Sequence, residues 1–218
     1  MYKISVEIMK KIYFLGVCFL LLSCNNKEVL LPKGGETIIS DVQDHSPIYF
    51  FFKTEDKDTL IEVNKKNAIS STNWLFNIDK RLPLKLVIPE IKKLQKKKKE
   101  SAHESGATEN HFTYMDSVMK TLAFLPFTDL SFKYEKPDIH ILHFYFDKND
   151  LVHFNDLVFS KNQLQDFINK LPINEQKRIN FSFDKSMSFE QYIQTKILIW
   201  NLKIPYYALK SYHKEYIY

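Results

Sequence analysis

Glycine and cysteine are scarce in this sequence. Of its 218 residues, four are glycine and two are cysteine. No G-x-G-x-x-G and no G-K-[ST] motif occurs, so nothing in the sequence argues for a nucleotide-binding loop. It also lacks an H-E-x-x-H zinc motif, a cysteine-based metal site and the G-x-S-x-G motif of serine hydrolases. We therefore expect a protein that is not an enzyme and holds neither a metal nor a cofactor.

A strong excess of one charge is also missing. The chain has 31 basic and 26 acidic side chains, and its net charge of +5 is modest. This balance is not that of a nucleic-acid-binding protein. Hydrophobic residues make up 44% and aromatic residues 15% of the chain, which is enough for a packed core. The length suits one ordinary domain or two small ones, and no small-molecule substrate is evident.

The N-terminus carries the most informative pattern. Lys10 and Lys11 precede an apolar run of eleven residues, 12–22, which is followed by Ser23 and Cys24. A positive start, a short apolar core and a small residue at its end predict a secretory signal. The alternative is a single transmembrane anchor, but that needs about 20 apolar residues.

The residues at the end of this run, Leu21-Leu22-Ser23-Cys24, resemble the lipobox of bacterial lipoproteins. The resemblance implies that residues 1–23 are a signal peptide and that the thiol of Cys24 receives a lipid. The chain would then face the periplasm, attached to a membrane through Cys24. Asn25 replaces the aspartate that retains enteric lipoproteins at the inner membrane, which favours the outer membrane. Residues 24–46 are polar and predict a flexible tether.

The first half, residues 47–135, predicts a degenerate α/β unit. It is expected to begin with a hairpin of 48–53 and 59–63 and a strand or loop at 74–76. A helix opening at Pro89 and a disordered loop near 100–110 follow. A second helix, with Met115, Val118, Met119 and Leu122 on one face, then leads to an edge strand at 130–132. The proline is expected at the first helical position, where its missing N–H costs nothing.

The second half, residues 138–218, predicts a cleaner β-β-α-β-α-β unit. Its expected elements are strands at 139–146, 151–154, 178–183 and 204–209, and helices opened by the capping boxes Ser160/Gln163 and Ser188/Gln191. The fold class is therefore α+β, with two small related units after an N-terminal signal helix, each a sheet with helices on one face. A shift of 77 residues lays Phe112 on Phe189 and suggests an internal duplication. Chance similarity between two α/β segments remains an equal alternative.

The order and spacing of motifs in the second half carry a family resemblance. The motifs are Phe144–Lys148, Leu151–Phe154, Ser160–Leu171, Ile179–Lys185, Phe189–Trp200 and Ile204–Leu209. Over residues 138–210 the chain resembles the periplasmic domain of the biopolymer-transport (ExbD/TolR) family. That family's membrane helix carries an aspartate for proton-driven work, whereas residues 12–22 contain no acid. The resemblance thus implies the periplasmic fold without the ordinary energy-coupling role.

Histidines and acids offer few candidates for chemistry. His140 and His143 are three apart on a strand and point to opposite faces, and His153 is expected across the hairpin near Phe144 or Tyr145. This geometry does not place three imidazoles on one zinc ion. His103 and His111 flank the expected loop and are expected to be solvated. The acids Asp147, Asp150 and Asp184 are expected to stabilise turns. Ser186 and Ser188 are expected in a turn and at a helix cap.

Lysines form the strongest charge feature, at Lys92, Lys93 and 96–99. They predict a solvated helix end, with contact to anionic lipid headgroups or an acidic partner as the alternative. The sequence as a whole predicts a non-enzymatic, membrane-anchored envelope lipoprotein that binds a protein or a cell-wall component. An exposed edge at 204–209 or 130–132 would allow strand addition. The alternatives are an accessory subunit of a proton-driven transport complex and a hydrolase with a scattered site.

Overall fold

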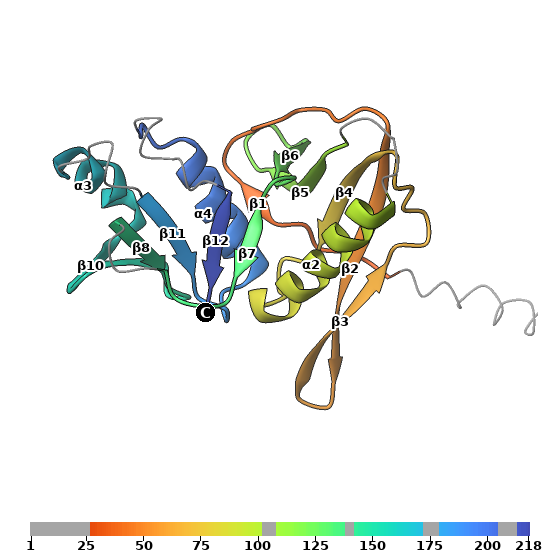
Figure 1. Ribbon diagram of the computed structural model, residues 1–218, viewed down its shortest axis with the longest axis horizontal. Coiled ribbons are helices and arrows are strands. Elements are labelled where there is room, and N and C mark those ends of the chain that lie inside the picture. The colour runs from red at the N-terminus through yellow and green to blue at the C-terminus, as the bar shows by residue number, and fades with distance from the viewer. Residues whose placement is uncertain (1–26, 102–107, 138–141, 172–178, 205–212) are drawn as a thin grey trace, which may run out of the picture.

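The computed structural model describes residues 27–101, 108–137, 142–171, 179–204 and 213–218. Two six-stranded mixed sheets lie side by side, with helices packed against them (Figure 1). This is compatible with the predicted α+β class. Residues 1–23, Cys24, His103 and His140 lie outside the described residues, as do residues 102–107 of the loop predicted near 100–110 and residues 205–209 of the strand predicted at 204–209. Within the described ranges, no helix is long and apolar enough to span a bilayer.

The first sheet has the strand order β1-β5-β4-β2-β3, with β6 added beside β5. The bounds are β1 Lys33–Gly34, β2 His45–Glu55, β3 Asp58–Asn64, β4 Asn73–Ile78, β5 Asn110–Asp116 and β6 Leu122–Pro126. The β2–β3 hairpin, with Phe52 opposite Ile61, confirms the predicted hairpin. Strands β2, β4 and β5 run parallel, and the helix α2, Leu84–Ser101, connects β4 to β5.

The predicted start of α2 at Pro89 is wrong, because the helix begins at Leu84 and contains the proline. The first turn is fixed from outside the helix. Leu84 N–H donates to the Met187 carbonyl at 3.0 Å, and Leu84, Val87 and Ile88 are buried. This burial outweighs the one backbone hydrogen bond that a proline in the second turn removes.

The helix predicted across Met115 and Leu122 is also wrong, because these residues pair across the β5–β6 hairpin. Asp116 forms the turn: its Oδ1 accepts the N–H groups of Val118 at 2.8 Å and Met119 at 2.9 Å. An aspartate that bonds its own backbone two residues on competes with helix formation. The apolar spacing that suggested a helix instead places Val118 and Met119 at an exposed tip.

Residues 27–44 pack against the first sheet, which they join through β1. Ile39 and Phe124 exchange backbone hydrogen bonds of 3.2 and 2.9 Å, and Val42 packs with Leu75 and Phe124. Nearer the start of this segment, the Leu30 carbonyl accepts the N–H of Lys80 at 2.8 Å. The flexible tether predicted for 24–46 is therefore corrected from Lys27 onward, because this segment covers apolar side chains that would otherwise face water.

The second sheet has the order β10-β9-β8-β11-β12-β7. The bounds are β7 Ser131–Lys133, β8 Leu142–Phe146, β9 Leu151–Phe154, β10 Leu157–Ser160, β11 Ile179–Phe183 and β12 Lys214–Ile217. A 3₁₀ turn, η1 Lys161–Gln163, leads into α3, Leu164–Lys170, and α4 spans Phe189–Trp200. The hairpin β8–β9 is present, and the predicted capping box at Ser188 is complete. At Ser160 the Gln163 side chain accepts the Ser160 backbone N–H, but the Ser160 hydroxyl makes no cap bond to the backbone.

Two predicted strands have different outcomes. The strand expected at 130–132 exists as the edge strand β7, but it pairs with β12 and so belongs to the second sheet rather than to a unit 47–135. Of the strand expected at 204–209, only Ile204 is described, and it lies in no helix or strand. The last described strand is β12, and neither β12 nor the short edge strand β10 was predicted.

The two sheets share one strand order. The order β1-β5-β4-β2-β3 in the first sheet matches the order β7-β12-β11-β8-β9 in the second. The last pair in each series is an antiparallel hairpin, β2–β3 in the first sheet and β8–β9 in the second. An Asp-Lys pair follows β4 at Asp79 and β11 at Asp184, before the helices α2 and α4. A shift of 105 residues aligns these pairs. The shift of 77 is wrong, because it lays Phe112 in strand β5 on Phe189 in helix α4.

Reciprocal backbone contacts join the two turns that precede these helices. Leu84 N–H donates to Met187 at 3.0 Å, and Phe189 N–H donates to Leu82 at 2.8 Å. With the shift of 105 residues each bond is the counterpart of the other, so the two turns are related by an approximate two-fold axis. The rings of Phe112 and Phe189 meet edge to face at 5.4 Å, and one continuous core runs through both sheets.

Candidate functional site

The second sheet has a polar face opposite its helices. Successive side chains on a strand point to opposite faces. Phe144 and Phe146 of β8 are therefore buried toward the helices, whereas His143 and Tyr145 point the other way. A cleft of about 640 Å³ lies on this polar face. Its lining residues are Lys136, His143, Tyr145, His153, Asn155, Asp184, Lys185 and Tyr218.

His143 stands at the base of the cleft. Its Nε2 lies 2.6 Å from the Ser182 hydroxyl on β11 and 3.3 Å from the Tyr218 hydroxyl. Burial, with a contribution from the nearby Lys136 cation, lowers the pKa of His143 to about 4. The imidazole is therefore neutral at pH 7 and is too weak a base for efficient proton abstraction there. Ser182 is itself fully buried, which keeps its hydroxyl from a substrate.

Two tyrosine rings form the aromatic part of the cleft. Tyr145 and Tyr218 stack with their centroids 5.1 Å apart and their planes at 20°. Burial raises the pKa of Tyr145 to about 12 and also raises the pKa of Tyr218. Both phenols thus keep their protons and can donate hydrogen bonds. The Lys136 ammonium lies 5.6 Å from the Tyr218 ring centroid, which adds a cation beside the aromatic surface.

The turn between β8 and β9 positions the opposite wall. Asp147 Oδ1 accepts the N–H groups of Asn149 and Leu151, which confirms its predicted turn role. Its Oδ2 lies 2.9 Å from Nε2 of His153, across from Tyr145 as predicted. Burial alone would raise the pKa of Asp147, but the hydrogen bond with His153 and those from the backbone outweigh it and lower that pKa.

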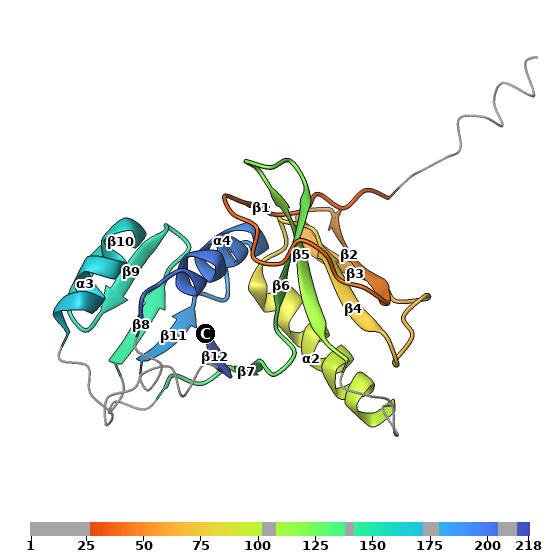
Figure 2. The same ribbon diagram turned by 90° about the horizontal axis from the view of Figure 1, so that it is seen from above.

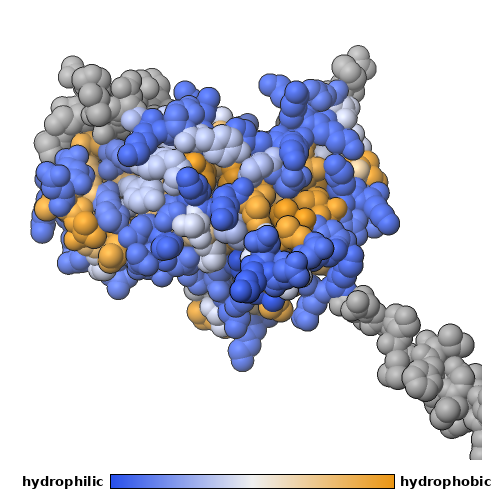
Figure 3. Space-filling model, turned by 90° about the horizontal axis from the view of Figure 1, so that it is seen from below, coloured by the Kyte–Doolittle hydropathy of each residue, from blue (hydrophilic) through white to orange (hydrophobic). Residues whose placement is uncertain are grey.

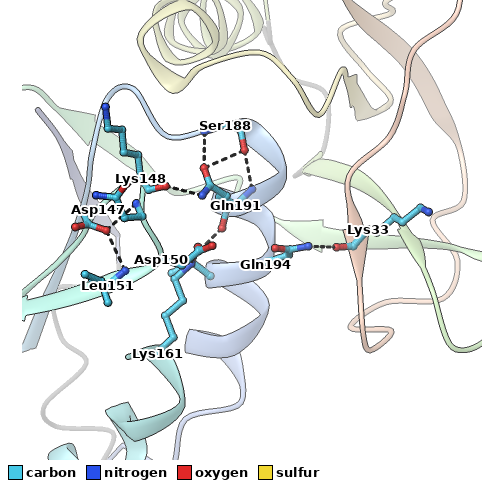
Figure 4. Close-up of polar contacts among 11 residues, drawn as sticks. Lys33, Asp147, Lys148, Asp150, Leu151, Lys161, Ser188, Gln191 and Gln194 are labelled. Carbon is cyan, nitrogen blue, oxygen red and sulfur yellow. Dashed lines mark hydrogen bonds and ion pairs between the residues drawn. The ribbon is translucent and has the colours of Figure 1, made fainter. Parts of the chain in front are cut away.

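Figure 4 shows this turn held against the start of α4. Gln191 donates its side-chain N–H to the Lys148 carbonyl at 2.8 Å while its side-chain oxygen completes the Ser188 capping box. Asp150, at a positive φ of 63°, pairs with Lys161 of η1. Asp184 likewise closes a turn by accepting the N–H of Ser186 at 2.7 Å. These acids act as turn residues, and in the described part of the chain no group of three His, Cys, Asp or Glu residues could hold a metal.

The structure brings together residues that the sequence left apart. His143 and His153 both line the cleft, whereas the sequence predicted only that His153 lies across the hairpin near Phe144 or Tyr145 and that the histidines do not share a zinc ion. Tyr218, Ser182 and Lys136 were not predicted at all. The alternation of β11, with Phe181 and Phe183 facing the core, was the signal that could have placed Ser182 on the opposite face. The prediction that His111 is solvated is wrong, because His111 is buried in β5, outside the cleft, with its Nε2 3.1 Å from the carboxylate of Glu109.

The lysine-rich end of α2 is only in part the solvated surface that was predicted. Lys98 is 5% exposed, and its ammonium donates to the Glu109 carbonyl and to the Asn110 side chain. Burial lowers the pKa of Lys98 to about 8. Lys92 donates to the Phe132 carbonyl at 3.1 Å. The prediction of a solvated helix end is therefore wrong for these two lysines, which join α2 to β5 and β7.

Comparisons with protein-family models, with curated proteins and with solved structures find no match to this chain. The cleft on the second sheet is the candidate site because it combines a cavity, an aromatic surface and convergent polar groups.

Proposed function

We propose that this chain is a lipid-anchored protein of the bacterial cell envelope that binds a cell-wall ligand in the cleft of the second sheet without transforming it. The anchor rests on the lipobox-like Leu21-Leu22-Ser23-Cys24 at the end of a short apolar run. The ligand site rests on one observation, the stacked Tyr145–Tyr218 pair within a polar cleft.

The chemistry of the lining favours a glycan that carries carboxylates. Rigid aromatic rings offer a large apolar face at low entropic cost, and the apolar face of a sugar ring can lie against it. The hydroxyls of Tyr145 and Tyr218 remain donors at neutral pH. Lys136 and Lys185 add cations to the rim, where they can pair with carboxylate groups. A cell-wall fragment made of amino sugars and a short acidic peptide has all of these features.

Binding is favoured over catalysis by the state of the polar groups. His143 has a pKa of about 4, and the neighbouring Ser182 is fully buried. An activated nucleophile needs an accessible hydroxyl and a base that is effective near the working pH. A hydrolase remains the alternative. Incubation of soluble wall fragments with the protein tests it, because a hydrolase would cleave the fragments, whereas a binding protein would bind them saturably and leave them intact.

The test of the binding site is a titration with soluble wall fragments. In Tyr145→Ala we expect affinity to fall about 10-fold, because a hot-spot aromatic contributes more than 1 kcal/mol. The matched control is Tyr134→Ala, since Tyr134 is also a partly exposed tyrosine but lies beside Lys92 and outside the cleft. Isothermal titration calorimetry measures both. Equal affinities in the two variants would contradict the cleft as the binding site.

A protein partner is the second candidate, and exposed edges favour it. Strands β7 and β10 are the outer strands of the second sheet, and Leu157 and Val158 of β10 are each 54% exposed. A partner could add a strand at either edge. Co-purification with inner-membrane channel proteins would favour the related alternative, an accessory subunit of a proton-driven transport complex. Fractionation with the outer membrane would count against it.

We also infer that the two units descend from one ancestral unit. The shared strand order, the Asp-Lys pairs after β4 and β11 and the reciprocal bonds of Leu84 and Phe189 support this. The described elements of the second unit, a hairpin followed by α3, β11, α4 and β12, support its proposed resemblance to the ExbD/TolR periplasmic fold. Strand β6 and the β10–α3 segment are then later additions to one copy each.

A further inference from the structure

The tip of the β5–β6 hairpin exposes apolar side chains. Val118 is 71% and Met119 67% exposed, and Leu122 at the start of β6 is 47% exposed. From Ser117 to Leu122 the one charged residue is Lys120. Seen from below, the surface is mostly hydrophilic, with hydrophobic residues in separate areas (Figure 3). A group of apolar side chains on a projecting tip indicates contact with another surface.

The hairpin tip is a rigid feature. Asp116 fixes the turn through two backbone N–H groups, and its Oδ2 also accepts a hydrogen bond from Thr37. At the base of the tip, Ser117 N–H donates to the Gly34 carbonyl of β1 at 2.9 Å. Val118 and Met119 are therefore held away from the core by the backbone around them, and burying them needs a partner from outside.

The chain preceding the described residues points to a bilayer as that partner. Cys24 is three residues before Lys27, so an extended chain places it within about 10 Å of Lys27. Lys27 is held on the first sheet by its ion pair with Glu62. A lipid on Cys24 would consequently bring the body itself to the membrane surface. No long tether would separate them.

The tip and the start of the described chain lie on the same side of the molecule. Figure 2 shows the red segment that begins at Lys27 and the end of the β5–β6 hairpin on the side of the first sheet away from α2. The segment also reaches the base of the tip, because β1 pairs with β5 at Gly34 and Asp116. A bilayer that holds Cys24 is therefore within reach of Val118 and Met119.

We propose that the β5–β6 tip inserts Val118 and Met119 into the lipid bilayer to which Cys24 anchors the chain, so that the first sheet docks on the membrane in a fixed orientation. This inference rests on the proposed lipid anchor. Apolar side chains enter the boundary between headgroups and acyl chains, and Lys120 stays at the level of anionic headgroups.

The test labels the tip with an environment-sensitive dye. The sequence from residue 25 onward contains no cysteine, so Met119→Cys provides a single thiol in the processed chain. The matched control is Val158→Cys, an exposed apolar position on β10, the outer strand of the other sheet. On vesicles of phosphatidylethanolamine and phosphatidylglycerol, we expect about a threefold rise in emission at 119 as the dye leaves water. Emission at 158 should not change.

A second arrangement separates this inference from the lipid anchor. A histidine tag placed before residue 25 holds the body on vesicles that carry nickel-chelating lipid, whether or not Cys24 is a lipidation site. Emission at 119 that rises here, and falls when lipids carry a quencher in their acyl chains, supports the tip contact. Equal emission at 119 and 158 on these vesicles would overturn the proposal. Absence of lipid on Cys24 in the native protein would instead overturn the anchor.

Discussion

His143 shows how a single side chain is set by its position in the sheet. On β8 it faces the cleft, where burial and Lys136 favour the neutral imidazole. Asn180, its partner in register on β11, and the neighbouring Ser182 are buried on the same face. A neutral histidine can exchange hydrogen bonds with Ser182 and Tyr218 without a charge penalty. The polar floor of the cleft therefore depends on His143 remaining unprotonated.

This state predicts a pH dependence of stability. The pKa of His143 falls from 6.5 to about 4 on folding, so the unfolded chain binds more protons between these values. Because of this residue, the free energy of unfolding should rise by about 2 kcal/mol from pH 4 to pH 6.5. The rise should be complete above pH 6.5. In His143→Gln that part of the rise should disappear, as measured by urea unfolding at each pH.

The control for this measurement is His45→Gln, because His45 lies on the first sheet, away from the cleft. His45 is the first residue of β2, and its imidazole Nδ1 lies 2.7 Å from the Val42 carbonyl oxygen. The pH profile of His45→Gln should keep the rise of the parent chain. An unchanged profile in His143→Gln would mean that protonation of other groups causes the rise.

Residues of this kind are hard to place from sequence. Tyr218 and Lys136 lie far apart along the chain and meet the β8 face only through the pairing of β12 with β11 and β7. That pairing is non-local and leaves no periodic signal. Asp147 was predictable, because an aspartate at the end of a strand bonds the backbone that immediately follows it.

At the scale of elements, local signals were reliable where the chain makes its own hydrogen bonds. The capping box at Ser188 predicted α4, and the alternating segments around residues 55–58 and 147–150 predicted two hairpins. The signals failed where distant contacts decide. The start of α2 depends on Met187. The apolar spacing from Met115 to Leu122 is that of a helical face, but the Asp116 side chain closes a turn there.

The two capping boxes lead to different expectations for stability. The Ser188 hydroxyl accepts the N–H of Gln191 and caps the buried helix α4, whereas Ser160 makes no such bond to the backbone of η1. Ser188→Ala should lower the free energy of unfolding by about 1 kcal/mol. Ser160→Ala should have a clearly smaller effect. Urea denaturation of both variants measures the difference, and equal losses would contradict the assigned caps.

At the scale of the whole molecule, the two sheets depend on a close contact between β1 and α4. A methyl group on Gly34 would lie 2.5 Å from Ile197 Cδ1 and 2.8 Å from the Tyr114 ring. Gln194 of α4 also donates to the Lys33 carbonyl at 3.1 Å (Figure 4). The N-terminal segment around β1 thus lies between the two units. The sequence had predicted this segment to be part of a flexible tether.

Glycine substitutions test this contact. Gly34→Ala should lower the free energy of unfolding by about 2 kcal/mol, because the added carbon overlaps ring and methyl groups that are already packed. Gly35→Ala is the matched control, since nothing lies within 4 Å of the carbon it adds. Thermal unfolding of the two variants should separate them by several degrees. Equal melting temperatures would show that α4 and β1 are not in close contact.

The proposed lipid anchor at Cys24 would decide how the whole molecule meets its surroundings, because Cys24 precedes Lys27, the first described residue, by only three residues. The most direct measurement is the intact mass of the native protein from fractionated membranes, beside a Cys24→Ala variant. Loss of residues 1–23 together with an added lipid mass, absent in the variant, is the result that the account predicts. An uncleaved chain without lipid would contradict it and return the apolar run 12–22 to the role of a membrane-spanning segment.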